Sequence, residues 1–163
     1  MDRFQAETLA AMSRRLIEMP RRWAAETPEA PAVWFQDRLW RHGDILAGIE
    51  AARTVLLDAG VRAGDRVALV IENGVAGLCY FHAIAALDCW AVLANARLSP
   101  RELEVIFEES GARFAVFGTG ESETAAKHAA GRGVTEKSSP HFADIALLLL
   151  DDNAPAEPVF DAS

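Results

Sequence analysis

The sequence has little cysteine: two residues, Cys79 and Cys89, among 163. Both lie in an apolar stretch, ten positions apart. On one helix they would be about 15 Å apart along the axis, whereas the Cα atoms of a disulfide lie within about 7 Å of each other. We therefore expect two free thiols, which is typical of a reducing compartment.

Long apolar runs are also missing. The longest uncharged run, residues 73–87, is shorter than the roughly 18–20 residues that a membrane helix needs. The first twenty residues include Asp2, Arg3 and Glu7 and contain no apolar core of a signal peptide. We expect no membrane span and a cytoplasmic location.

The sequence has fewer basic than acidic residues. Lysine and arginine number 16 against 24 aspartate and glutamate residues, which gives a formal net charge of −8. A chain of this sign is repelled by a phosphate backbone, and we expect no nucleic acid among its partners.

Familiar catalytic signatures are absent from the sequence. It contains neither the G-x-S-x-G elbow of serine hydrolases nor the G-x-x-x-x-G-K-[ST] loop of NTPases. None of the histidines, His42, His82, His128 and His141, is followed by a His or Cys three or four positions later, as is usual in zinc sites. We expect no metal site and no catalytic residue, and we interpret His82 as a hydrogen-bonded core residue.

Two weaker patterns have simpler explanations. Gly118–Gly120 follows an expected strand, but the third glycine of a dinucleotide fingerprint is replaced by Glu123, so a plain strand-to-helix loop is favoured. Asp151 and Asp152 could form a metal carboxylate pair. Their alanine- and proline-rich surroundings favour a solvated linker instead.

What the sequence does contain is an alternation of strands and helices. Residues 67–71 are continuously apolar, which is typical of a strand buried on both faces of a sheet. Ser99 and Glu102 form a capping box with Pro100 between them. We expect the remaining elements as a hairpin over 32–40, helices over 45–59, 74–87 (capped by Asn73), 99–111 and 121–130, strands over 91–93, 114–117 and 145–150, and a loop over 131–140.

Short connections between alternating elements predict an α/β fold, with a mainly parallel sheet and helices on both faces. We divide the chain into an N-terminal helical segment (1–22), one α/β domain (23–150) and an acidic flexible tail (151–163) with no periodicity.

Two stretches carry a family resemblance. Residues 57–73 read LDAGVRAGDRVALVIEN, and residues 86–117 read ALDCWAVLANARLSPRELEVIFEESGARFAVF. In order and spacing they resemble the N-terminal region of acyl-CoA synthetases, of the AMP-forming adenylate superfamily. The similarity covers most of residues 23–117 and continues weakly to about 160. It implies that residues 23–150 are part of the large N-terminal AMP-binding domain of such an enzyme.

The resemblance also implies a function for Arg97. In the complete enzyme a carboxylic acid, ATP with Mg²⁺, and CoA give acyl-CoA, AMP and pyrophosphate. The arginine of the element Asn95-Ala96-Arg97-Leu98 is then expected to contact a phosphate of CoA, which suits its forked guanidinium. The alternative is a surface ion pair of Arg97 with Glu102 or Asp88.

The chain departs from the family in what it lacks. The Ser/Thr/Gly-rich, lysine-containing ATP loop is absent, as are the adenine motif, the ribose-binding aspartate, the hinge and the C-terminal lysine. The resemblance therefore implies no catalysis and no cofactor bound by this chain alone.

Three interpretations of this incomplete chain stay open: an inactive N-terminal fragment, one chain of a split ligase, or a binding or scaffold domain. Its expected partners are CoA, the missing downstream part of the ligase, or a second copy through an uncovered apolar face. The acyl substrate stays open, with a fatty or aryl acid preferred.

Overall fold

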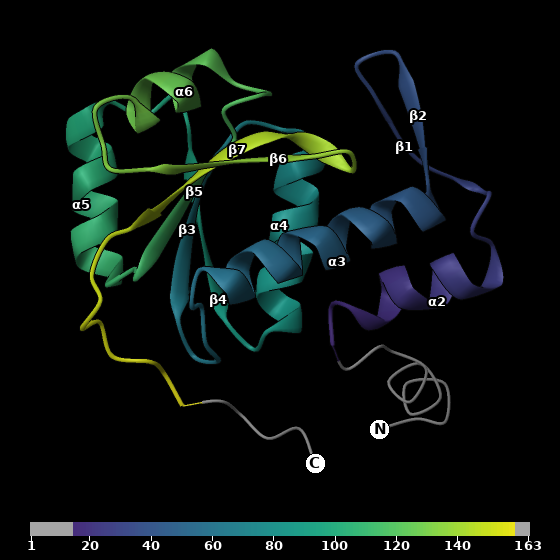
Figure 1. The fold of residues 1–163 in the computed structure, drawn as a ribbon, viewed down its shortest axis with the longest axis horizontal. Helices are drawn as coiled ribbons and strands as arrows, with labels where there is room; N and C mark the ends of the chain where they lie inside the picture. The colour runs from purple at the N-terminus through teal and green to yellow at the C-terminus, as the bar shows by residue number, and fades with distance from the viewer. Residues whose placement is uncertain (1–14, 159–163) are drawn as a thin grey trace, which may run out of the picture.

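The structure, a computed structural model, describes residues 15–158 (Figure 1). The helices are α2 (Glu18–Glu26), α3 (His42–Asp58), α4 (Val75–Ala86), α5 (Pro100–Ser110) and α6 (Glu123–Ala129). The strands are β1 (Pro31–Phe35), β2 (Arg38–Arg41), β3 (Arg66–Ile71), β4 (Trp90–Asn95), β5 (Phe114–Phe117), β6 (Thr135–Ser139) and β7 (Phe142–Leu149).

The main sheet has the strand order β4-β3-β5-β7-β6. Strand β3 is parallel to both of its neighbours, β4 and β5. Strand β7 runs antiparallel to β5, and β6 antiparallel to β7. The α/β class is confirmed, and the sheet is mixed: a parallel core of three strands is extended on one side by an antiparallel pair.

Helices cover both faces of this sheet, as the sequence predicts. Val67 and Leu69 of β3 pack into a core with α3 and α4. The alternate residues Ala68 and Val70 face the opposite side and pack with α5 and α6. All four side chains are fully buried, which explains why this strand is continuously apolar.

The ends of the helices follow local sequence signals. The Ser99 backbone N–H donates to the Glu102 carboxylate at 2.8 Å, and the Glu102 N–H donates to Ser99 Oγ at 3.3 Å, so the capping box is present. Gly111 caps the other end of α5 in the left-handed region at φ 62°. Gly60 follows α3 with φ 86°, a conformation that suits glycine because it has no Cβ.

Two local predictions are wrong. Asn73 does not cap α4; the N-cap is Gly74, whose own side chain can offer no oxygen. Residues 131–140, expected as a loop, contain strand β6. That strand is polar because it lies at the sheet edge and gains its order from backbone pairing with the apolar β7.

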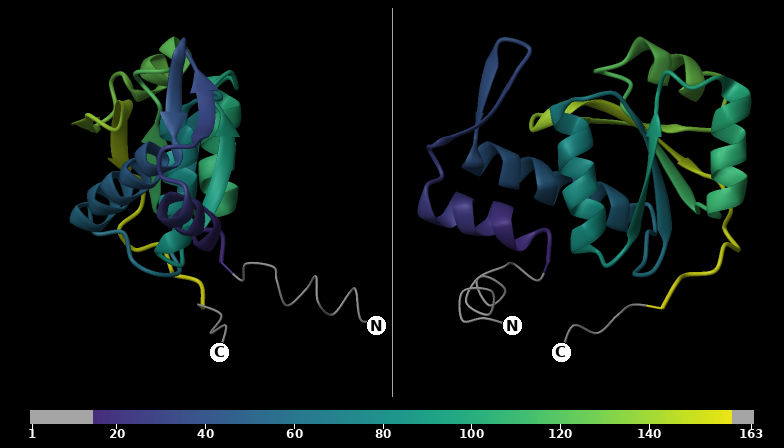
Figure 2. Two further views of the ribbon diagram at one scale, coloured as in Figure 1. Left: turned by 90° about the vertical axis from the view of Figure 1, so that its right-hand side faces the viewer. Right: turned by 180° about the vertical axis from the view of Figure 1, so that it is seen from behind.

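The hairpin β1–β2 forms a separate two-stranded sheet, as predicted, and projects beyond α3 (Figures 1 and 2). Helix α2 continues across the boundary that the sequence suggests between residues 22 and 23. Pro20 lies in its first turn, where the missing N–H of proline costs no helical hydrogen bond. Most of the predicted N-terminal segment, residues 1–14, lies outside the described residues.

Residues 151–158, expected as a flexible tail, have no helix or strand but lie against the domain. The Glu157 backbone N–H donates to the Gly64 carbonyl at 2.8 Å, and its carboxylate pairs with Arg66. Ala154 is buried. The end of this segment therefore lies beside the amino-terminal end of β3.

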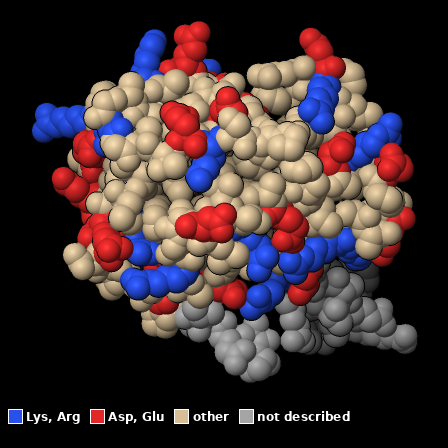
Figure 3. Space-filling model, in the orientation of Figure 1, with Lys and Arg blue, Asp and Glu red and all other residues tan. Residues whose placement is uncertain are grey.

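Both cysteines are free, as expected. Cys79 is buried in α4, whereas Cys89 lies beyond the end of that helix and is half-buried. Between residues 15 and 158, none of the helices has the length and apolarity to cross a bilayer. On the face shown in Figure 3, acidic and basic side chains are intermingled rather than gathered by sign.

Candidate functional site

Arg97 lies in the turn that joins β4 to α5. Two backbone hydrogen bonds fix the turn. The Ala96 N–H donates to the carbonyl of Ile71, at the end of β3, at 3.1 Å, and the Leu98 N–H donates to the Asn95 carbonyl at 3.1 Å. Asn95 Oδ1 accepts from the Arg97 N–H at 2.9 Å. Arg97 is thus held beyond the carboxyl ends of β3 and β4, the edge at which open α/β sheets bind ligands.

His128 also holds this turn, which the sequence did not predict. It reaches over from α6, is 8% exposed, and places Nε2 3.0 Å from both the Ala96 and the Leu98 carbonyl oxygens. Because both partners are acceptors, Nε2 carries the proton and donates. The only signal in the sequence was a histidine on the inner face of a short helix, and this pattern does not indicate which groups the histidine contacts.

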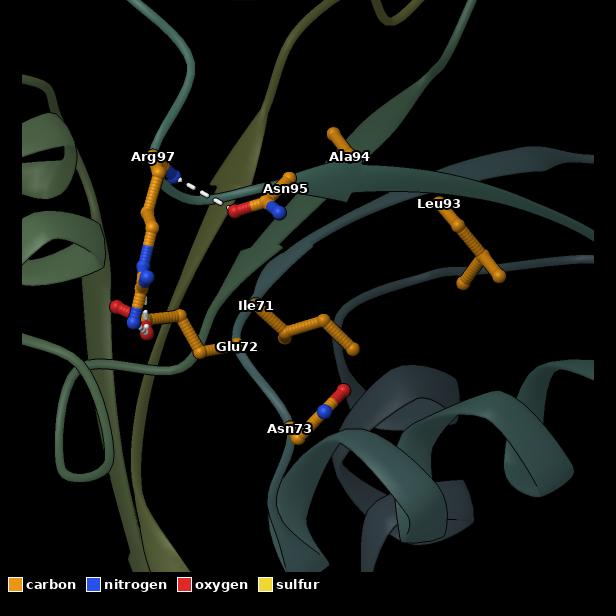
Figure 4. Close-up of a pocket in the computed structure, with 7 residues that line it drawn as sticks. All are labelled: Ile71, Glu72, Asn73, Leu93, Ala94, Asn95 and Arg97. Atoms are coloured by element: carbon orange, nitrogen blue, oxygen red, sulfur yellow. Dashed lines mark hydrogen bonds and ion pairs between the residues drawn. The ribbon is translucent and has the colours of Figure 1, made fainter.

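The guanidinium of Arg97 pairs with Glu72, the residue that follows β3 (Figure 4). Nε and Nη2 donate to the same oxygen, Glu72 Oε2, at 3.0 and 2.7 Å. The sequence-based alternative of an ion pair is therefore correct in kind, but the partner is neither of the predicted residues. Asp88 pairs with Arg15, and Glu102 serves the α5 cap.

Glu72 is also held by a second partner, Ser122. Ser122 Oγ donates to its other oxygen, Oε1, at 2.8 Å, and the same Oγ accepts from the Ala125 N–H at the start of α6. Hydrogen bonds from Arg97 and then Ser122 lower the pKa of the Glu72 carboxyl. Glu72 is therefore a carboxylate at neutral pH and carries a full negative charge beside Arg97.

Glu72 and Arg97 line an open cavity of about 520 Å³. Ile71 and Leu93 supply apolar wall, and Asn73 and Asn95 supply amides (Figure 4). Leu93 is 62% exposed. An apolar hollow between β4 and α4 continues from it, lined also by Leu78 and Phe81.

A second carboxylate, Glu121, occupies the N-terminus of α4. Its Oε1 accepts from the Val75 N–H at 3.0 Å and the Ala76 N–H at 3.2 Å. Burial raises the pKa of this carboxyl, and the two backbone hydrogen bonds lower it less. Because Glu121 takes the free N–H groups, the end of α4 is not open to an external anion.

Other predicted candidates have structural roles. In the loop Gly118–Gly120, the Gly120 N–H donates to the Asp144 carbonyl at 2.8 Å, and a Cβ on Gly120 would lie 2.6 Å from the Asp144 nitrogen. The glycine is needed for this close approach to β7. Asp152 pairs with Arg113 at 2.9 Å. Within residues 15–158, no group of three or more His, Cys, Asp and Glu residues could hold a metal ion.

His82 differs from its predicted role. It is half-buried in α4, and its Nδ1 is buried without a hydrogen-bond partner among the described residues. Its ring packs edge-on against Phe81, with centroids 5.6 Å apart. Burial lowers its pKa, so the neutral form is favoured.

The parallel three-strand core, with helices on both faces of a mixed sheet, defines an α/β domain. In open α/β sheets the edge beyond the carboxyl ends of the parallel strands, where Arg97 and the cavity lie, is where ligands bind. The chain belongs to the family of AMP-binding enzymes, whose model matches residues 20–161. The predicted resemblance is thereby confirmed.

Curated relatives include acyl-CoA ligases. The chain is 39% identical over 64 residues to a long-chain-fatty-acid–CoA ligase, FadD13, of Mycobacterium tuberculosis, which is 39% of this chain and 13% of that protein. It is 33% identical over 90 residues to the 2-succinylbenzoate–CoA ligase of Geobacillus kaustophilus, which is 55% of this chain and 18% of that protein. The chain thus matches less than a fifth of the length of these relatives.

A solved structure supports the same grouping. The inhibitor-bound N-terminal domain of FACL13 from Mycobacterium tuberculosis superposes with a TM-score of 0.60 at 30% identity, over 63% of this chain and 26% of that one. The fold is accordingly that of the N-terminal domain of adenylate-forming enzymes.

Proposed function

We propose that this chain forms one part of an AMP-forming acyl-CoA ligase, and that Arg97 contacts a phosphate of CoA there. The observation that carries the proposal is the place of Arg97: a largely exposed guanidinium beyond the ends of two parallel strands, on the wall of an open cavity. Within the described residues, its Nη1 has no hydrogen-bond partner. The relatives that are CoA ligases support this assignment.

The cavity suits the nucleotide end of CoA. Apolar side chains can contact a base or a ribose, and the two asparagine amides can donate or accept hydrogen bonds. Arginine binds phosphate through parallel charge-assisted hydrogen bonds. CoA carries a terminal phosphate on its ribose, and dephospho-CoA lacks it, which gives a matched pair of probes.

The test is titration of the 163-residue chain with CoA and dephospho-CoA, followed by NMR. Arg97→Ala should weaken CoA binding by roughly fivefold to thirtyfold, the loss of a charge-assisted contact in a wet site. It should leave dephospho-CoA binding unchanged. Arg22→Ala, which removes a positive charge from α2, is the control. Equal affinity of the wild type and Arg97→Ala for CoA would remove the proposed role.

We further propose that these 163 residues do not catalyse ligation alone, because the sequence has no glycine- and hydroxyl-rich loop for a triphosphate. Incubation with ATP, Mg²⁺ and a fatty or aryl acid should release no AMP. AMP release would contradict this, and tight ATP binding without turnover would favour a binding domain. Activity restored by a second polypeptide carrying the missing loop would favour a split ligase.

The proposed contact for a partner, either the rest of a ligase or a second copy, is the edge of β4. The Trp90 and Ala96 N–H groups point to β3, where they donate to the Asp65 and Ile71 carbonyls. Along a strand, the backbone N–H and C=O groups of successive residues point alternately to the two sides of the strand. Leu93 is three positions from both Trp90 and Ala96, so its backbone groups face the outer edge. Strand β4 ends the strand order of the described sheet, and such an edge is a template for pairing.

A further inference from the structure

The Glu72–Arg97 pair has a consequence for any anionic ligand of Arg97. Nε and Nη2 together form one edge of the guanidinium fork, and both donate to Glu72 Oε2, at 3.0 and 2.7 Å. A phosphate that approaches this edge meets a carboxylate already in place. Glu72 therefore stands where the ligand's own oxygens would bind.

Glu72 is not free to swing aside at no cost. Its second oxygen accepts the hydrogen bond from Ser122, which is 5% exposed and caps α6. The Glu72 side chain is 26% exposed, against 75% for Arg97. The carboxylate is thus the more constrained member of the pair, and the arginine is the more exposed one.

We propose that Glu72 is a built-in competitor that limits the affinity of Arg97 for phosphate. A phosphate gains the Nε–Nη2 edge only when Arg97 leaves Glu72, so the free energy of the ion pair is subtracted from that of binding. This inference rests on the proposed role of Arg97 and adds a residue that sets its strength.

The opposite effect is physically possible and gives the test its second outcome. By holding one edge of the guanidinium, Glu72 could orient the remaining donors and so strengthen binding. Competition predicts tighter binding when Glu72 is removed, and orientation predicts weaker binding. Exposed ion pairs are worth little, and the arginine is mostly exposed, so the expected change is small but measurable.

The experiment compares Glu72→Gln and Glu72→Ala with the wild type in titrations of the full chain with CoA, after circular dichroism has shown that each variant is folded. We expect CoA binding to tighten by roughly twofold to fivefold in Glu72→Ala, as the loss of an exposed ion pair predicts. Glu72→Gln keeps the shape without the charge and should lie between the two. Dephospho-CoA should bind all three equally.

Two controls isolate the mechanism. Glu109→Gln removes one negative charge from the exposed face of α5 and should leave CoA affinity unchanged. In an Arg97→Ala background, Glu72→Ala should have no effect, because the competitor acts through Arg97. Weaker CoA binding by Glu72→Ala, or the same gain without Arg97, would overturn the inference. If Arg97→Ala alone changes nothing, the proposed function fails instead, so the two failures are distinguishable.

Discussion

Glu121 Oε1 lies 3.0 Å from the backbone nitrogen of Val75, forty-six positions earlier in the chain. A side chain from the loop between β5 and α6 thus caps α4, a helix of the opposite layer. The cap ties together two loops at the carboxyl ends of neighbouring parallel strands, β3 and β5. It gives a first prediction about the stability of this edge.

Glu121→Ala should destabilise the chain by about 1 kcal/mol, the usual loss when the acceptor at a helix N-terminus is removed. The Val75 and Ala76 N–H groups would lose their partner. Urea unfolding followed by circular dichroism measures the change. Glu108→Ala, on the exposed face of α5, should be close to neutral, and equal effects of the two substitutions would argue against the cap.

Gly74 is constrained by the same carboxylate. A Cβ on Gly74 would lie 1.9 Å from Glu121 Oε2, although its φ of −175° is open to any residue. Gly74→Ala should therefore cost about 1–2 kcal/mol through the clash. In a Glu121→Ala background most of this cost should disappear. Gly133→Ala, with nothing within 4 Å of the added methyl, is the neutral control.

The stability contributed by Glu121 should depend on pH. Burial raises its pKa in the folded chain, so the folded state binds the proton more readily than the unfolded state does. This proton-linked part of its contribution, which is separate from the cap, is fully present below the unfolded pKa and is lost as the pH rises through the folded pKa. The stability of the wild type minus that of Glu121→Gln should thus increase as the pH falls from 7 towards 4.5. A decrease over this range, measured by urea unfolding, would contradict the raised pKa.

A buried ion pair stabilises the other end of the sheet. Arg113 Nη1 lies 2.9 Å from Asp65 Oδ2, with side-chain exposures of 10% and 0%. Asp65→Ala should cost about 3 kcal/mol, the low end for breaking a buried pair, because Arg113 keeps Asp152 and the Gly60 carbonyl. Asp152→Ala, at a side chain 72% exposed, should cost much less. Similar losses in thermal or urea unfolding would refute the ranking.

The sequence predicts self-association through an uncovered apolar face, and we propose the exposed β4 edge as the place where it occurs. Leu93→Lys should shift the chain towards monomer in light scattering at micromolar concentrations, because a charge on the edge opposes strand pairing. Val105→Lys, at another exposed apolar position on α5, is the control. A wild type that is monomeric throughout this range would contradict the prediction.

Much of the fold was predictable because its signals are local. The capping box at Ser99, the glycines at 60 and 111, and the apolar run of β3 each act within a few residues of themselves. Strand β6 was missed because its order depends on pairing with β7 rather than on its own polar side chains. A local sequence pattern does not indicate pairing with a strand that becomes a neighbour only in the folded chain.

The candidate site also combines features that the local sequence predicts with features that depend on the fold. The position of Arg97 followed from a strand, a short turn and a capped helix in sequence. Its ion-pair partner Glu72 is 25 positions away. His128, which bonds the Ala96 and Leu98 carbonyls on either side of Arg97, is 32 and 30 positions from those residues. These groups meet only because β3 and α6 flank β4 and its turn. Glu121 was missed for the same reason, and the nearby Asn73 was taken for the cap.

The antiparallel course of β7 decides where the described chain leaves the domain. Residue 157 lies against Gly64, at the start of β3, whereas the Arg97 cavity lies beyond the end of that strand. Six residues of strand separate the two places, about 20 Å. A fluorophore or an affinity tag fused after residue 158 would therefore start away from the cavity mouth. Labelled chain can report on occupancy of the cavity without a dye attached at its entrance.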